Sequence, residues 1–288
     1  MNNYILQSRV FGLLRWVLIA LLVVATVFPF YYMAMMSFVP IEDLLRNPLR
    51  IVPDFGSVTI ETYQRVIASE EEGGFGFGRF MRNSAIVAVA ATMLTMVLAV
   101  PASYAMTRLR FAGRRTISAA FLAVYMFPTI IIAVPIFVGF QLLGLGTSLF
   151  GLTIAYIALT VPVSVHMLRS YLKGIPESID EAALMDGASR WRILTRITVP
   201  LAMPTIMSTA LYSFMIAWNE FLFALLFLSA KQDLWTVSLG LTRLADGQEV
   251  SRTILMAGSV LLTIPIVVLY GIAERWLTDG LTAGANKG

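Results

Sequence analysis

Cysteine is absent from this chain, and histidine occurs once, as His166. The lack of cysteine excludes disulfide bonds, thiolate metal sites and a cysteine nucleophile. A single histidine argues against a metal centre or an acid–base pair built on imidazole. Charged residues are also scarce, at 13% of 288 residues, about half of their share in soluble domains, whereas 58% are hydrophobic. This composition predicts an integral membrane protein.

Long apolar stretches make up most of the chain. A helix needs about 20 apolar residues to cross roughly 30 Å of hydrocarbon. We therefore predict an all-α membrane protein that forms a single transmembrane domain over residues 1–288. Its six transmembrane helices are expected near residues 16–38, 84–107, 116–142, 149–168, 201–228 and 253–273. The first apolar run is too long for a signal peptide and no cleavage pattern follows it, so we expect it to remain as a span.

The distribution of basic residues predicts the orientation. Six spans place both termini on one side of the membrane, and the larger share of the 21 Lys and Arg residues falls in the segments on that side. By the positive-inside rule, both the N-terminus and the C-terminus are expected to be cytoplasmic. The basic segment at residues 108–115 is then most simply a topology signal that faces lipid headgroups, with contact to a partner protein as the alternative.

Glu220 is the carboxylate that lies well inside a predicted span. A charge there must face the bundle interior or a water-filled path. It either lines a passage, holds a broken helix, or makes a structural hydrogen bond between helices. Its presence, with prolines in several spans, leaves an ion-coupled secondary transporter as an alternative function. The candidates for a translocation path are Tyr156, Tyr212, Trp218, Asn219 and Glu220, although packing is the simpler explanation for the three aromatic ones.

A polar island at residues 174–200 separates the fourth and fifth predicted spans. The bilayer core cannot solvate such a segment, so it must lie on an aqueous face. Glu177 and Asp180 suit the N-terminus of a short helix, where the helix dipole favours negative charge. Gly187 suits the C-cap of that helix, because glycine readily adopts φ > 0, and Ser189 can cap a second helix. These signals predict two short helices joined by a sharp turn.

Helical spacing predicts which faces these two helices present. On the first helix one face is expected to hold Ile179, Ala182, Ala183 and Asp186. Its two alanines keep the surface slim, so that another protein can approach closely. On the second helix one side is expected to hold Trp191, Leu194 and Thr198. The island is therefore interpreted as a docking element, with an ordinary interfacial loop as the alternative.

The island also resembles the E-A-A-x₃-G-x₉-I-x-L-P loop of bacterial ABC-importer permeases. The matching residues are Glu181, Ala182, Ala183, Gly187, Ile197 and Pro200, while Val199 stands where that family usually has leucine. Nearly the whole chain is similar to the smaller permease subunit of maltose-type carbohydrate importers. Further matches are Asn83-Ser84, Phe111-x-Gly113, Met126-x-Pro128, Trp218-Asn219-Glu220-Phe221 and, within the tail at residues 277–288, the stretch 280–288.

This resemblance implies a division of labour in the inner membrane of a bacterium. The chain would be a permease without catalytic, metal or cofactor sites, paired with a second permease and surrounded by lipid. Two ATPase subunits would hold ATP and Mg²⁺, and an extracytoplasmic binding protein would deliver a sugar or sugar-like solute; no nucleic acid takes part. The coupling loop, including Glu181 and Asp186, would sit in a cleft of one ATPase subunit. The tail residues Leu281, Thr282, Gly284 and Lys287 would reach toward the interface between the ATPases.

Overall fold

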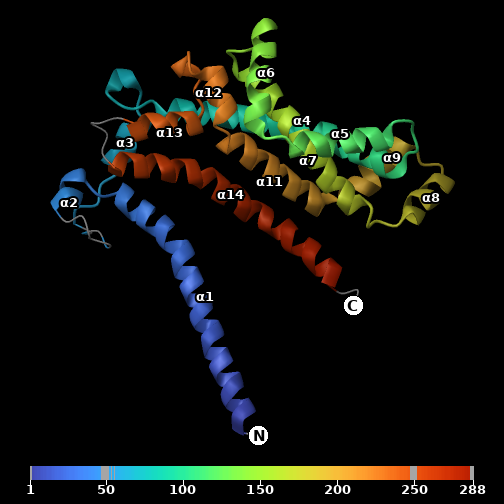
Figure 1. Ribbon diagram of the computed structural model, residues 1–288, viewed down its shortest axis with the longest axis horizontal. Helices are drawn as coiled ribbons and strands as arrows, with labels where there is room; N and C mark the ends of the chain where they lie inside the picture. Colours follow the sequence, from blue (N-terminus) through green and yellow to red (C-terminus); the bar gives the residue numbers. More distant parts are fainter. Residues whose placement is uncertain (1, 47–51, 53, 55, 247–251, 286–288) are drawn as a thin grey trace. The chain divides into compact units, whose positions relative to one another are not determined.

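The computed structural model describes residues 2–46, 52, 54, 56–246 and 252–285 (Figure 1). Every regular element in these residues is a helix, which confirms the predicted all-α class. Within the same residues, four helices are long and apolar enough to cross a membrane, and the number rises to at most six if each of two bent helix pairs is one span.

The four straight candidate spans agree with four of the predicted ones. They are Phe11–Ser37 within α1 (Asn2–Ser37), α4 (Phe77–Arg108), α7 (Leu149–Leu172) and Arg252–Glu274 within α14 (Arg252–Ala285). These four helices lie where the first, second, fourth and sixth spans were predicted, with ends that differ by several residues. That each of them crosses the membrane stays a prediction.

The third predicted span is not one helix. Its residues form α5 (Arg114–Met126) and α6 (Thr129–Leu142), and the two helices are bent by 105°. Phe127 between them is extended, with φ −77° and ψ 134°, because the ring of Pro128 disfavours a helical conformation in the residue before it. The span predicted at residues 116–142 is therefore two helices, and whether the bent pair crosses the membrane as one span stays a prediction.

The fifth predicted span is broken as well. α11 (Met203–Asn219) ends before Glu220, and α12 (Leu222–Leu228) starts a new helix two residues later. The preceding turns, Arg190–Leu201, form a bent pair with α11 at 80°. The segment predicted as the fifth span, residues 201–228, therefore consists of two helices interrupted at Glu220, and a broken helix was one of the interpretations offered for this residue.

Two compact units divide the chain, and α13 (Val237–Asp246) and α14 contribute residues to both. The first unit consists of Met1–Gly76 and Arg243–Leu261. The short helices of this unit are α2 (Ile41–Arg46), α3 (Glu61–Ile67) and the 3₁₀ turn η1 (Glu70–Glu72).

Polar contacts link the short helices of the first unit to its longer ones. The hydroxyls of Ser37 and Tyr63 lie 2.7 Å apart, which ties the end of α1 to α3. The Tyr63 ring packs against Phe38 with the ring centroids 4.9 Å apart. Arg243 pairs with Glu70 of η1. These contacts fold the segment after α1 back into a compact unit.

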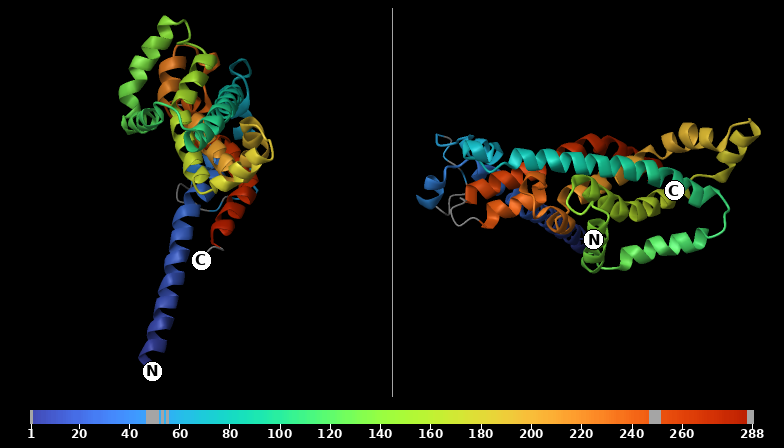
Figure 2. Two further views of the ribbon diagram at one scale, coloured as in Figure 1. Left: turned by 90° about the vertical axis from the view of Figure 1, so that its right-hand side faces the viewer. Right: turned by 90° about the horizontal axis from the view of Figure 1, so that it is seen from above.

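The second unit consists of Phe77–Thr242 and Leu262–Gly288. Its centre is formed by α4, α7 and α11, which run side by side in the views of Figures 1 and 2. Hydroxyl pairs join these helices in the interior: Thr95 and Thr160 at 2.7 Å, and Ser164 and Ser213 at 3.1 Å. α8 lies at one end of this bundle and α12 lies toward the other (Figure 1).

The remaining elements of the second unit are short. They are α8 (Glu177–Met185), α9 (Arg190–Ile193), a π-helical turn η2 (Leu194–Thr198), α10 (Val199–Leu201) and the 3₁₀ turn η3 (Gln232–Leu234).

Candidate functional site

The segment after α7 folds into two short capped helices. α8 begins after Pro176, whose fixed φ suits a helix start, and Asp180 lies in its first turn. Gly187 follows α8 with a φ of 77°, and its N–H donates to the carbonyl of Leu184 at 3.0 Å. The hydroxyl of Ser189 accepts a hydrogen bond of 3.3 Å from a backbone N–H in the first turn of α9. The predicted glycine C-cap and serine N-cap are both confirmed.

α8 has one face packed on its own chain and one face open. On the packed face, Asp180 is 4% exposed and Ala183 is 9% exposed. Ala183 lies in an apolar cluster with Tyr104 of α4, Leu172 of α7, and Ile193, Leu194 and Ala202. The exposed positions are Ile179, Glu181, Ala182, Met185 and Asp186. The prediction that Ala182 and Ala183 share an outward face is therefore wrong, because Ala183 serves the internal contact.

The turns that follow Ser189 pack through a different stripe from the one predicted. Ile193, Leu194 and Thr198 are buried, whereas Trp191 is 68% exposed. Trp191 lies two residues, or about 200° around a helix, from Ile193, so burial of Ile193 turns Trp191 outward. The prediction that Trp191 shares the side of Leu194 is wrong. Of the remaining motif residues, Ile197 packs against the apolar cluster and Pro200 is exposed.

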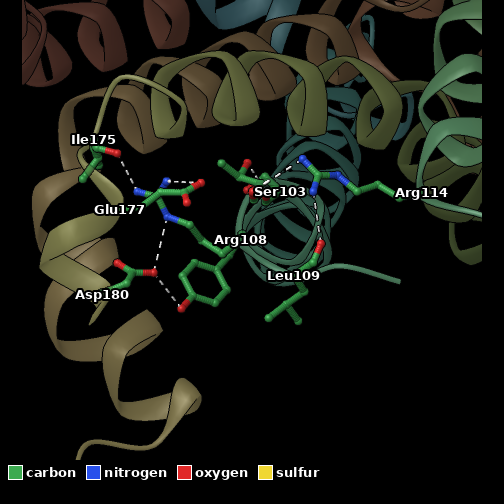
Figure 3. A network of polar contacts seen from close by, with 9 residues as sticks. Ser103, Arg108, Leu109, Arg114, Ile175, Glu177 and Asp180 are labelled. Atoms are coloured by element: carbon green, nitrogen blue, oxygen red, sulfur yellow. Dashed lines mark hydrogen bonds and ion pairs between the residues drawn. The ribbon is translucent and has the colours of Figure 1, made fainter. Parts of the chain in front are cut away.

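A buried arginine fastens the first turn of α8 to the end of α4 (Figure 3). The Arg108 side chain is 5% exposed, and its guanidinium donates to the carbonyl of Ile175 at 2.7 Å. It also lies 3.3 Å from the carboxylate of Asp180 and 3.7 Å from that of Glu177. The hydroxyl of Tyr104, one turn earlier in α4, donates to the same Asp180 carboxylate at 3.0 Å.

The expected role of Arg108 as a lipid-facing topology signal is wrong, because its side chain is engaged inside the protein. Arg114 in the same basic segment also turns inward and donates to the carbonyls of Leu109 and Thr107 near the end of α4 (Figure 3). Sequence reasoning missed both roles. The sequence held one weak indication of these contacts. Tyr104 and Arg108 are four residues apart and so share a face of α4, but a single sequence does not show which residue they contact.

The predicted tail residues are described only in part. Leu281, Thr282 and Gly284 lie within α14, and the placement of their side chains is outside the described residues, as is Lys287 altogether. The structure therefore leaves the predicted contact of the tail with ATPase subunits as a prediction.

Glu220 organises the interruption between α11 and α12. Its carboxylate accepts hydrogen bonds from the backbone N–H groups of Phe223 at 3.0 Å and Ala224 at 3.2 Å, so it caps α12. The hydroxyl of Tyr156 from α7 donates to the same carboxylate at 2.9 Å, and that of Ser238 donates to the Glu220 carbonyl at 2.6 Å. Two of the interpretations proposed for Glu220 therefore hold together: it lies at a break in a helix, and it makes a hydrogen bond between helices.

A cavity of about 420 Å³ lies beside this interruption, between the α5–α6 bend and the helices α7 and α11. Its lining consists of Val124, Phe127, Thr129, Ile132, Leu159, Thr160, Pro162, Val163, Tyr212, Ile216, Glu220 and Leu222. Of the predicted path residues, Tyr212 and Glu220 therefore face a common space. Tyr156 is fully buried and supports Glu220 from α7.

The other two predicted path residues are engaged elsewhere. Trp218 is 2% exposed, its Nε1–H donates to the carbonyl of Leu262 at 3.0 Å, and its ring stacks on Phe214. Asn219 is exposed and donates to the carbonyl of Met215 at 2.9 Å, one turn earlier in α11. In this conformation Trp218 anchors α11 to α14, and Asn219 closes the last turn of α11.

Asn83 and Ser84 at the start of α4 hold the chain that follows α12. The amide of Asn83 donates to the carbonyls of Asp233 at 2.8 Å and Trp235 at 3.0 Å. The hydroxyl of Ser84 accepts from the N–H of Val237 at 2.7 Å, at the start of α13. Because Ser238 bonds the Glu220 carbonyl, α4 is connected through this segment to the interruption.

Residues 96–282 match the family of binding-protein-dependent transport system inner membrane components. The chain belongs to this family. It is 38% identical over 270 residues to the inner membrane ABC transporter permease protein YcjP of Escherichia coli, and covers 94% of each chain. It is 36% identical to the trehalose/maltose transport system permease protein MalG of Thermococcus litoralis, over 93% of this chain and 94% of that one.

A solved structure of a bacterial ABC transporter involved in import of the acidic polysaccharide alginate has the same fold. The TM-score is 0.78 at 23% identity, over 93% of this chain and 97% of the other. A second structure, of a bacterial alginate ABC transporter in complex with a periplasmic protein that holds an alginate pentasaccharide, gives a TM-score of 0.63 at 16% identity, over 95% and 94%.

Family membership decides between the two predicted modes of transport. This chain is a multi-pass inner-membrane permease of a binding-protein-dependent ABC importer, and ATP hydrolysis resides in separate subunits. Import driven by ATP therefore replaces the ion-coupled alternative. The matched region includes both the α8–α9 segment and the Glu220 interruption, so both belong to the permease module itself.

Proposed function

We propose that this permease forms half of the membrane passage of an importer for a sugar or sugar-like solute, and that α8 docks in a cleft of one ATPase subunit. The docking proposal rests on the observation that one side of α8 is buried against the permease while the other side is exposed. Asp180 and Ala183 hold it to the permease, whereas Glu181, Ala182 and Met185 on the other side are exposed, Met185 at 88%. A short helix that is bonded to the permease on one side and bound by a partner on the other can transmit a movement of the partner to the permease.

The composition of the exposed face suits a protein partner. A large exposed apolar side chain such as Met185 adapts its shape to a hydrophobic socket. Ala182 beside it allows close approach, and Glu181 and Asp186 add charge at the rim. Gly187 ends the helix in a left-handed turn, so α8 presents one face of defined length.

The orientation follows from the same assignment. In an ABC importer the ATPase subunits work in the cytoplasm, so a docked α8 is cytoplasmic. Four of the predicted spans precede α8 and two follow it. Because both numbers are even, a cytoplasmic α8 places both termini in the cytoplasm as well. This agrees with the predominance of Lys and Arg in the segments assigned to that side.

The complete transporter contains further chains. Residues 1–288 form one transmembrane domain, with a coupling loop at residues 174–200, and pair with a second permease in the lipid bilayer. Two ATPase subunits hold ATP and Mg²⁺, and the tail at residues 277–288, with Leu281, Thr282, Gly284 and Lys287, reaches toward them. An extracytoplasmic binding protein delivers the solute.

The proposed solute class is supported by the relatives. Besides the trehalose/maltose permease, similar chains include the diacetylchitobiose uptake permease DasC of Streptomyces coelicolor, at 32% identity over 93% of this chain and 94% of that one. The cavity beside Glu220 combines the polar groups of Tyr212, Thr160 and Glu220 with apolar walls. This mixture suits a neutral sugar, and the hydroxyl of Tyr156 holds the Glu220 carboxylate at the edge of the cavity.

Cross-linking tests the docking proposal. The chain has no cysteine, so Met185→Cys provides a single thiol on the exposed face of α8. In the assembled transporter, a thiol-to-lysine cross-linker is expected to join this chain to an ATPase subunit. Leu172→Cys, at a position that is 4% exposed on the packed side, is the matched control and should give no such product. Products of Met185→Cys that contain only lipid or the second permease would contradict the docking proposal.

A thermal-shift screen of the cognate binding protein tests the solute. We expect trehalose, maltose or diacetylchitobiose to raise its melting temperature, and the same sugar to enter vesicles that hold the complete transporter. Stabilisation only by amino acids or inorganic ions would contradict a sugar as the cargo.

A further inference from the structure

α4 touches functional elements at both of its ends. At its C-terminal end Arg108 and Tyr104 hold α8, and at its N-terminal end Asn83 and Ser84 hold the segment that bonds the Glu220 interruption. Asn83 and Arg108 are 25 residues apart in α4, so they lie about 38 Å apart at 1.5 Å per residue. The two contacts are therefore far apart and joined by one helix.

We propose that Arg108 is a positioning residue that fastens α8 to α4, so that a movement of α8 is carried along α4 to the Glu220 interruption and the cavity beside it. This inference rests on the proposed docking of α8 in an ATPase subunit. It adds the residue through which the docked helix acts on the membrane passage.

The geometry of Arg108 is that of a clamp. Its planar guanidinium donates in several fixed directions, and here it meets the Ile175 carbonyl before α8 and the Asp180 carboxylate inside α8. The Arg108 and Asp180 side chains are 5% and 6% exposed, so water competes little for either. Tyr104 holds the same carboxylate from one turn earlier in α4. The first turn of α8 thus cannot shift far unless the end of α4 follows or these bonds break.

The far end of α4 is joined by equally direct bonds. Asn83 bonds the carbonyls of Asp233 and Trp235, Ser84 accepts from the N–H of Val237, and the neighbouring Ser238 bonds the Glu220 carbonyl. Coupling between distant sites is carried by such chains of packed and hydrogen-bonded groups. A displacement of α4 therefore acts on the carbonyl of the residue that caps α12.

The reactivity of a thiol placed in the cavity shows whether a displacement of α4 changes the surroundings of the cavity. Ile216 lines the cavity on α11, and Ile216→Cys would be the only thiol in the permease. In the complete transporter, reconstituted with its ATPase subunits and binding protein, a non-hydrolysable ATP analogue is expected to change the rate at which a maleimide labels this thiol. In an Arg108→Gln background the nucleotide-dependent change should shrink by roughly tenfold or more, within the usual range of coupling between sites.

Matched variants separate the clamp from general damage. Arg110→Gln removes an exposed arginine from the same segment and should keep the full nucleotide response. Arg108→Lys keeps the charge but lacks the planar fork that reaches two partners, so it should give an intermediate response. Tyr104→Phe removes one hydroxyl and should weaken the response slightly, and it replaces Arg108→Gln in the test if that variant does not assemble.

The Met185→Cys cross-link, measured in each background, distinguishes the two proposals. The inference is supported if Arg108→Gln keeps the cross-link to the ATPase subunit and loses the labelling response. A full labelling response in Arg108→Gln would overturn it. So would loss of the cross-link in that variant, since Arg108 would then only keep α8 folded. Absence of the cross-link with Arg108 in place would instead overturn the docking of α8.

Discussion

Two of the helix breaks in this permease, the one between α8 and α9 and the one between α11 and α12, satisfy the freed backbone groups in different ways. Between α8 and α9 a left-handed Gly187 ends the first helix and the Ser189 hydroxyl caps the second, with both residues exposed. Between α11 and α12 no glycine intervenes, and the Glu220 carboxylate caps the new helix with help from Tyr156 and Ser238.

The difference follows from the solvent. At an aqueous face water satisfies the helix-end groups that caps leave over, so two small residues are sufficient. Glu220 is only partly exposed, and a backbone polar group that water does not reach needs a partner from the protein. One carboxylate that accepts several hydrogen bonds, supported by hydroxyls from neighbouring elements, meets that need. Substitutions at the two places should therefore differ in size, and the following predictions test this.

Glu220→Ala should have the largest effect. It leaves the N–H groups of Phe223 and Ala224 and the hydroxyl of Tyr156 without their acceptor. At about 1–3 kcal/mol for each buried unsatisfied group, the loss of stability is roughly 3–9 kcal/mol. Thermal unfolding of the purified transporter in detergent measures it.

The controls for this prediction lie at the same position and beside it. Glu220→Gln keeps an amide oxygen that accepts from the backbone and should lose much less stability. Asn219→Ala removes a bond from an exposed side chain to its own helix and should change stability by less than about 0.5 kcal/mol. Equal melting temperatures for Glu220→Ala and Asn219→Ala would show that water reaches the interruption.

Asp180→Ala should have the next largest effect, because it leaves the buried Arg108 guanidinium with only the more distant, exposed carboxylate of Glu177 at 3.7 Å. Removal of one partner from a buried ion pair costs about 3–5 kcal/mol. Glu181→Ala, the next residue along α8, changes an exposed side chain and should alter stability by less than about 0.5 kcal/mol. Uptake should fall in both variants, for different reasons. A stable Asp180→Ala permease would show that α8 does not depend on the clamp.

The exposed break was readable from the sequence because its residues carry local signals. Glycine at a helix end, serine before the next helix and acids in the first turn each mark a boundary wherever they occur, so α8 was predicted nearly in full. Glu220 was readable for a related reason: a carboxylate in an apolar run needs an explanation, and a broken helix was one of those offered.

The contacts between segments distant in the sequence could not be predicted from the sequence. Arg108 and Asp180 are separated by 72 positions in the sequence, and neither residue type indicates which residue it pairs with. Pro128 indicated a bend in the third predicted span, but not that the bend at Phe127 and Pro128 would reach 105°, because an averaged apolar run hides a break of two residues. Ala183 was assigned to the wrong face because helical spacing gives the faces of α8 but does not say which of them meets α4.

Gly187→Val should lower stability moderately, and through backbone strain alone. A Cβ at this position meets nothing within 4 Å, so the penalty comes from the backbone φ of 77° alone. A left-handed residue with a side chain costs about 1–2 kcal/mol. Gly187→Asn should cost less, because asparagine visits this region more readily. Uptake is expected to follow the order Gly187, Asn, Val. The reverse order would show that side-chain size at the partner interface governs the effect.

The smallest effect compares two serine caps in different surroundings. Ser189 caps α9 at an exposed position, with a bond of 3.3 Å. Ser148 caps α7 at a partly buried position and accepts from Gly151 at 3.0 Å. Loss of such a cap costs about 0.5–2 kcal/mol. Ser189→Ala should lie at the low end of this range, because water reaches the freed N–H, and Ser148→Ala at the high end. Thermal unfolding of the two variants, matched in side chain and role, isolates access of water as the variable. A larger loss for Ser189→Ala would mean that the exposed break depends on its own cap rather than on solvent, and the contrast with the Glu220 interruption would then require another cause.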